Sequence, residues 1–256
     1  MVHWFRTNMR ISSDLFNAFL KCPTKCLLRA AGEPASGNAY AEWVESQNAS
    51  YRATEIERLL SETPKGEVAV SPPLENLKAA KWRLAANLAA HARVNACDLE
   101  PEVDAVERAP PEGRGRPPQL IPIRFIFTNQ LGEDDKLLLA FDTFVLSEVT
   151  GREISFCRIV HGDDHSALKV KTAARSVEVR KCIERIAALL SRPTPPDLVL
   201  NRHCGECEFQ TRCRQKATEA DDLSLLSGMS EKERKKPMTT SRGRRPDHIN
   251  GDSNLP

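Results

Sequence analysis

Three cysteines near the end of the 256-residue chain constrain its fold more than any other feature. Cys204 and Cys207 are separated by two residues, and Cys213 follows after five more. A tight turn at Gly205, a residue that tolerates unusual backbone angles, would bring the first two sulfurs onto one ion. Cys213 lies within reach of the same ion. The spacing therefore predicts a metal centre in this segment.

A centre with three thiolates needs a fourth ligand, and the sequence offers several. His203 lies beside the first cysteine of the group, while Cys22 and Cys26 lie far away near the start of the chain. Zinc accepts either a Cys₃His or a Cys₄ set, whereas a [4Fe–4S] cluster requires four thiolates. Because small zinc sites are common, the spacing alone favours zinc.

Composition and local hydrophobicity place the chain among globular proteins of the cell interior. Hydrophobic residues make up 40% of the chain and charged residues 28%, with a formal net charge of +2. No stretch is long and apolar enough to span a bilayer, and Met1–Ser13 lacks the apolar centre of a signal peptide. We therefore expect a cytoplasmic protein with no membrane partner, in which the cysteines stay reduced.

Hydrophobic periodicity predicts an α/β fold with strands in mixed directions. The chain from 1 to 230 is expected to form one domain, and the basic, polar tail 231–256 to be disordered. Helices are expected over Ser13–Ala31 with an interruption at Cys22-Pro23, over Ala39–Leu60, weakly over Leu74–Lys81, and over Glu133–Thr150 and Ala173–Leu190; strands are expected over Val68–Val70, within Arg83–Val106, and over Gln119–Thr128, Ile154–Val160 and Ala167–Thr172.

The segment Cys22-Pro23-Thr24-Lys25 and the group Cys204, Cys207 and Cys213 together resemble the opening and closing motifs of a known family. They are similar to those of the RecB-like putative nucleases, the iron–sulfur branch of the PD-(D/E)xK nuclease superfamily. The resemblance extends over about Leu15–Lys236. It implies a restriction-endonuclease-like PD-(D/E)xK core, a mixed sheet flanked by helices, whose ends are joined by a four-cysteine cluster. It also makes Cys22 the fourth ligand and favours a [4Fe–4S] cluster over Zn²⁺.

The same resemblance implies Mg²⁺-dependent cleavage of DNA by acidic residues on adjacent strands. Asp104 matches the first acid of that motif. The next strand, Gln119–Phe125, contains no acid and therefore lacks the expected (D/E)-x-K. A literal Asp134-Asp135-Lys136 occurs where a helix is expected to begin, a place where acids are favourable for electrostatic reasons. We therefore expect a degenerate catalytic site.

The family resemblance also indicates the partners. It implies DNA, single-stranded or with free ends, and Arg114 and Arg116 beside the expected site could contact its phosphates. Similar proteins continue into a helicase module, so this chain is expected to be a truncated form without it. The alternative is a non-catalytic DNA-binding or assembly module stabilised by an iron–sulfur cluster or zinc. A structural zinc domain unrelated to nucleases is a third hypothesis.

Overall fold

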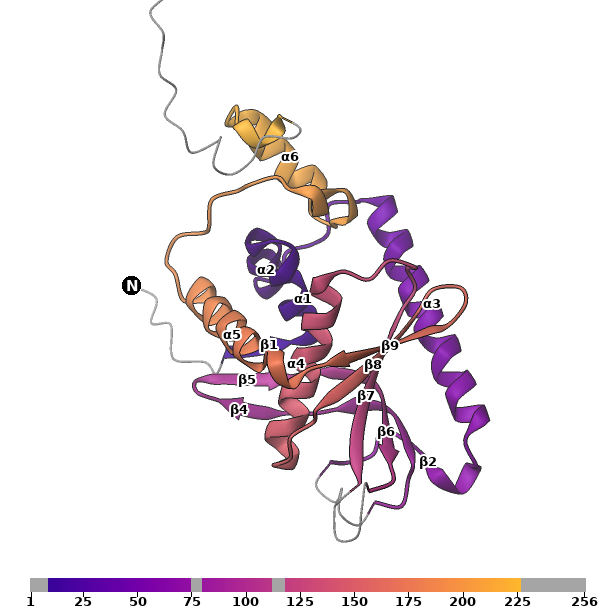
Figure 1. Cartoon of the computed structure of the whole chain (residues 1–256). Coiled ribbons are helices and arrows are strands. Elements are labelled where there is room, and N and C mark those ends of the chain that lie inside the picture. Colours follow the sequence, from indigo (N-terminus) through magenta and orange to yellow (C-terminus); the bar gives the residue numbers. More distant parts are fainter. Residues whose placement is uncertain (1–8, 75–79, 112–117, 227–256) are drawn as a thin grey trace, which may run out of the picture.

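The computed structural model describes residues 9–74, 80–111 and 118–226, which form a mixed α/β fold (Figure 1). The α-helices are α1 (Ser13–Lys21), α2 (Pro23–Ala30), α3 (Ala39–Glu62), α4 (Glu133–Thr150), α5 (Ser176–Leu190) and α6 (Gln210–Glu219). The strands are β1 (Met9–Ser12), β2 (Val68–Val70), β3 (Leu84–Ala89), β4 (Ala92–Val94), β5 (Cys97–Glu100), β6 (Glu102–Ala109), β7 (Gln119–Ile126), β8 (Phe156–His161) and β9 (Ser166–Lys171). Short 3₁₀ helices η1 (Lys65–Glu67), η2 (Ala173–Arg175), η3 (Arg202–Glu206) and η4 (Leu223–Leu225) lie in the connections.

The strands form two sheets of mixed direction. The larger sheet has the order β2-β3-β6-β7-β8-β9, in which β2 is parallel to β3 and β7 is parallel to β8 while the other neighbours are antiparallel. The smaller sheet has the order β1-β5-β4, with β1 parallel to β5. The first strand of the chain therefore pairs with a strand about ninety residues later.

Helices cover both faces of the larger sheet (Figure 1). The main apolar core lies between the sheet and the helices α1, α4 and α5, and it extends to the smaller sheet through Ile11 and Leu99. On the opposite face, α3 packs its apolar side, which includes Ile56 and Leu59, against Ile123 and Phe125. The sheet is thus the middle of three layers.

Most of the helices and strands predicted from periodicity are confirmed, and one sheet was not foreseen. The break at Cys22-Pro23, the long helix α3, the strand β7, the helix α4 and the β8–β9 hairpin all lie where the sequence indicated. The segments β1, β4 and β5 are only three or four residues long, too short to show a repeating pattern. Most of the weak helix expected over Leu74–Lys81, and the whole tail 231–256, lie outside the described residues.

Among the helices in the described ranges, none combines the length and the hydrophobicity needed to cross a lipid bilayer. This finding agrees with the absence of a long apolar stretch in the sequence.

The contact between Phe16 of α1 and Phe141 of α4 provides a test of this packing. Both side chains are fully buried, and their rings stack with centroids 4.4 Å apart. We expect Phe16→Ala to lower the free energy of unfolding by about 3–5 kcal/mol, because it leaves a cavity at the centre of the core. Urea unfolding would measure the change. The exposed Val177→Ala is the control, and an equal effect of the two substitutions would contradict the assignment of this core.

Candidate functional site

Cys22 lies between α1 and α2, where the helical conformation is interrupted. Helix α1 ends at Lys21, and Cys22 has an extended backbone with φ −168°. Pro23 then occupies the first turn of α2, where its missing N–H costs nothing. The Cys22 N–H still donates to the Ala18 carbonyl, so the backbone at the break is fixed. The half-buried thiol therefore lies between two helices in a defined position.

The other three cysteines lie on a short 3₁₀ helix and on the helix that follows it. Cys204 is in η3, whose start is capped by Asn201, and Cys207 ends this turn. Cys213 is in the first turns of α6. The predicted tight turn is present, since the Cys207 N–H donates to the Cys204 carbonyl. Gly205 has no positive φ, because a 3₁₀ turn requires none.

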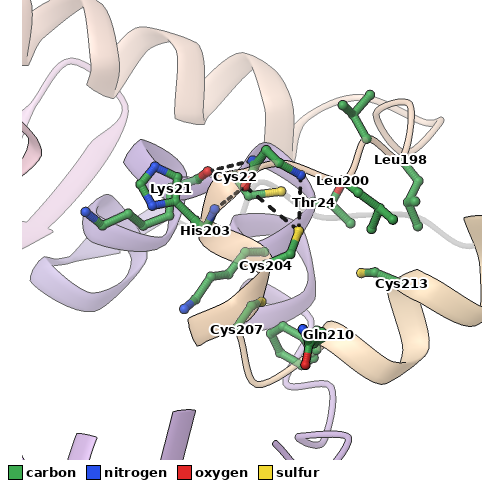
Figure 2. Close-up of a pocket in the computed structure, with 14 residues that line it drawn as sticks. Lys21, Cys22, Thr24, Leu198, Leu200, His203, Cys204, Cys207, Gln210 and Cys213 are labelled. Atoms are coloured by element: carbon green, nitrogen blue, oxygen red, sulfur yellow. Dashed lines mark hydrogen bonds between the residues drawn. The ribbon is translucent and has the colours of Figure 1, made fainter. Parts of the chain in front are cut away.

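The structure brings these four cysteines together around one pocket (Figure 2). Cys22, Cys204, Cys207 and Cys213 all line it, together with apolar side chains such as Leu200. Burial, followed by the charges of the other three thiols, raises the pKa of Cys213 to about 11. The thiols are therefore close enough to influence one another electrostatically. Across the described ranges, however, no group of three or more His, Cys, Asp or Glu side chains is arranged to hold a metal ion as it stands.

The chemistry of the pocket fits a soft metal centre. Four thiols in apolar surroundings are the donors that zinc or a [4Fe–4S] cluster accepts. Cys26 does not line this pocket and is fully buried. His203 does line it, and burial together with the nearby charge of Lys21 lowers its pKa. This histidine faces Asp134 at 3.9 Å, so the predicted alternative ligand is already near another partner.

Glu208 holds the segment that carries Cys204 and Cys207 against helix α2. Its carboxylate lies 2.8 Å from Lys25 Nζ and 2.6 Å from Arg29 Nε. Its carbonyl accepts hydrogen bonds from the N–H and the hydroxyl of Ser36. Burial acts to raise the pKa of Glu208, but the hydrogen bonds from the two cations outweigh it and the pKa is lowered. Protein contacts therefore hold the segment that carries Cys204 and Cys207 against α2 beside the four thiols.

Two asparagines extend this contact. Asn38 donates to the carbonyls of Gly205 and Cys207, while its side-chain oxygen accepts from the first turn of α3. Asn201 donates to the carbonyl of Lys21, directly before Cys22. Each asparagine therefore joins a cysteine-bearing turn to the opening segment.

The predicted catalytic acid, Asp104, lies on β6 where the sheet is irregular on both sides. Pairing of β6 with β7 stops at Ala105 opposite Ile123. Pairing with β3 passes over Asn87, which has a positive φ of 53°. The Asp104 side chain is buried, and its Oδ2 accepts the N–H of Phe125 at 2.9 Å. The carboxylate thus replaces a missing backbone partner in the sheet.

An arginine faces the other oxygen of this carboxylate. Arg52 Nε of α3 lies 3.2 Å from Asp104 Oδ1. On the neighbouring strand, Arg124 donates to the buried Asp142 of α4, which also accepts from the Ser13 hydroxyl. The carboxylate of Asp104 therefore lies in surroundings that contain positive charge and a backbone donor.

The second strand supplies no further carboxylate at this position, as its sequence indicated. Ile123 and Phe125 are buried in the apolar cluster beneath α3. The literal D-x-K is separate: Asp134 pairs with Lys21 at 2.9 Å, and Asp135 accepts from the N–H of Gly132 at the start of α4. These acids stabilise a helix start and a salt bridge beside the cysteine pocket. Arg114 and Arg116 lie outside the described residues.

Sequence reasoning missed a buried carboxylate on α3. Glu55 is fully buried, with its oxygens 2.7 Å from Arg58 Nη2 and 2.7 Å from His165 Nδ1. Tyr51, one turn earlier, stacks on His165 and donates its hydroxyl to the Gly162 carbonyl. The spacing of Tyr51, Glu55 and Arg58 would have placed them on one helix face, but Gly162 and His165, which contact Tyr51 and Glu55, come from the distant β8–β9 turn.

Comparisons with known proteins leave the family open. No family model matches the chain, and no curated protein matches it. Among solved structures, the one titled "Crystal structure of SSO0001" is similar with a TM-score of 0.47 and 15% sequence identity. The match covers 84% of this chain and 89% of that one. A likeness this distant assigns neither family nor activity.

The Glu208 contact can be tested by substitution. We expect Glu208→Gln to lower the free energy of unfolding by about 1–3 kcal/mol at neutral pH, because two cations lose a partly buried partner. The folded-state pKa of Glu208 lies below the ordinary value of 4.5 for a glutamate, so this contribution is present above about pH 4.5 and is lost as the pH falls through the folded-state pKa. Urea unfolding from pH 7 to pH 3 would measure it.

The matched control for Glu208 is Glu33→Gln. Glu33 pairs with Arg212 at 2.7 Å across the same two chain segments, but this pair is exposed. An exposed ion pair contributes little, so the control should change the free energy of unfolding much less than Glu208→Gln does. Equal effects of the two substitutions, or a Glu208 effect that persists at pH 3, would contradict the anchoring role.

Proposed function

We propose that this chain is a RecB-like nuclease-fold domain that binds DNA without cutting it, and that a four-thiolate centre closes it. The environment of Asp104 is the observation that favours binding without cleavage. Its two oxygens face Arg52 and the N–H of Phe125. Mg²⁺-dependent cleavage needs several oxygen ligands and an aligned water, and a single carboxylate engaged in this way cannot supply them.

The resemblance of the motifs around Cys22 and Cys204–Cys213 supports DNA as the partner. In the proposed domain, the positive charge of Arg52, 3.2 Å from the Asp104 carboxylate, occupies the side on which a metal ion would approach. Arg114 and Arg116, which lie between β6 and β7 in the sequence, remain the proposed phosphate contacts. A catalytically active nuclease is the competing function, with Asp104 as the Mg²⁺ ligand.

The pocket supports the proposed centre. Cys22, Cys204, Cys207 and Cys213 would hold a [4Fe–4S] cluster, or Zn²⁺ in the alternative. When bound, such a centre cross-links the two ends of the chain through metal–sulfur bonds. The ion pairs of Glu208 with Lys25 and Arg29 already hold the segments of Cys22 and Cys204–Cys213 side by side.

Metal analysis of the protein purified without oxygen tests the centre. We expect a brown protein with about four iron atoms and four sulfides per chain, the content of one [4Fe–4S] cluster. Cys22→Ser should lose most of this iron, since it removes one of four ligands. Cys26→Ser is the matched control and should keep it, because this thiol does not line the pocket. A content of one zinc per chain would show that the centre holds zinc and not a cluster. Equal iron in both variants would exclude Cys22 as a ligand.

A nuclease assay on the same preparation tests the function. We expect single-stranded DNA to be bound, measured by fluorescence anisotropy, and to remain intact with Mg²⁺ because Asp104 is not free to bind the ion. Binding should weaken as salt rises, as phosphate contacts require. Mg²⁺-dependent cleavage that disappears in Asp104→Asn would establish the nuclease instead. Absence of any DNA binding would reject both functions while leaving the thiolate centre unaffected.

A further inference from the structure

Aromatic rings form a continuous row beside α3, which we call the aromatic strip: Tyr40, Trp43, Phe127, Tyr51 and His165. The first two stack with ring centroids 5.8 Å apart. Phe127 meets the rings on either side of it edge-on, at 6.2 and 6.3 Å. The row ends where Tyr51 stacks on His165 at 6.1 Å.

One end of the strip is open to solvent. Tyr40 is 52% exposed and Trp43 is 49% exposed. The other large hydrophobic side chains that are exposed in the described residues, Val70, Val177 and Leu226, belong to separate elements or segments. Two adjoining, stacked aromatic rings on a surface offer flat faces to a binding partner.

The charges around the strip indicate the sign of that partner. Asp163 and Asp164 lie in the exposed turn beside His165. Burial, followed by the charges of Glu55 and of these two aspartates, raises the pKa of Tyr51 to about 12, although Arg58 acts against it. Within the described residues, neither aspartate has a cation within 4 Å. A phosphate backbone would be repelled here, and a cation would be attracted.

The neighbouring arginines do not reverse this sign, because both have carboxylate partners. Arg52 faces Asp104, and Arg58 pairs with Glu55 and Glu62. A partner with planar cationic groups matches the strip best, since guanidinium groups bind to aromatic faces, most strongly to tryptophan.

The chain itself contains such a partner. The segment 231–245 carries seven lysines and arginines against two glutamates. The described residues end at Leu226, close to Ser224, whose hydroxyl accepts from the Leu200 N–H beside the cysteine pocket. Asn38, at the start of α3, contacts the same region through Gly205 and Cys207. Lys232 follows Leu226 by six positions, a reach of about 20 Å when the chain is extended.

We infer that the aromatic strip binds the basic segment 231–245 of this chain. Arginine side chains lie on the faces of Tyr40 and Trp43, and cations of the segment approach Asp163 and Asp164. This binding site is separate from the cysteine pocket and does not depend on the proposed action on DNA.

Fluorescence of Trp43 in the full chain tests this inference directly. The chain has three tryptophans, and the difference between the protein and its Trp43→Phe variant isolates the signal of this one. Reversing the charges with R242E, R244E and R245E should make Trp43 more accessible to acrylamide, since the segment no longer covers it. High salt should have the same effect. Identical quenching before and after charge reversal would overturn the inference.

A peptide arm gives an independent readout. A labelled peptide of sequence 231–245 is added to the charge-reversed full chain, whose strip is open. Binding should weaken about ten-fold on Trp43→Ala and on Asp163→Asn with Asp164→Asn, through loss of cation–π and charge contacts. Val177→Ala, an exposed apolar change on α5, should leave it unchanged. Circular dichroism would verify that each variant is folded.

Single-stranded oligothymidylate serves as the competing occupant in the same assay. Binding of the oligonucleotide that requires Trp43, with no binding of the peptide, would overturn the inference in favour of nucleic acid. Peptide binding that is unchanged by Trp43→Ala and by Asp163→Asn with Asp164→Asn would overturn the inference as well. DNA binding elsewhere on the domain leaves the inference intact, so the two proposals can fail separately.

Discussion

The contact of Glu208 with Lys25 and Arg29 fixes the geometry on which the remaining site depends. It joins the turn that carries Cys204 and Cys207 to the helix that follows Cys22. Cys22 can share a pocket with Cys204, Cys207 and Cys213 only if these two distant segments of the chain lie side by side. The partly buried carboxylate of Glu208, with its two cationic partners, holds them together through protein groups alone.

The sequence predicted the structure correctly where a short stretch of residues strongly favours one conformation. The proline after Cys22 predicted an interruption of the first helix, and alternating or helical hydrophobicity located β7, α3 and α4. It could not reveal the β1-β5-β4 sheet, because strands this short gain their stability from partners distant in the chain. The four cysteines came from spacing and family resemblance, and the structure shows that they line one pocket.

The state of Asp104 lay outside what the sequence could predict. Its position on a strand was readable, but its partner Arg52 lies on a helix some fifty residues earlier. Such a pairing follows from how α3 crosses the sheet. The missing acid on β7 led to the prediction of a degenerate site. In the structure, Ile123 and Phe125 of this strand belong to the apolar contact with α3. In the proposed domain, this packing takes the place where further metal ligands would be needed.

Helix α3 connects the features of this domain. Asn38 begins it and binds the carbonyls of Gly205 and Cys207, so the cysteine segment fixes one end of the helix. Further along, the same helix supplies Arg52 to Asp104 and the exposed ring of Trp43 to the aromatic strip. The placement of this one helix therefore sets the positions of the cysteine turn, the Asp104 carboxylate and the strip relative to one another.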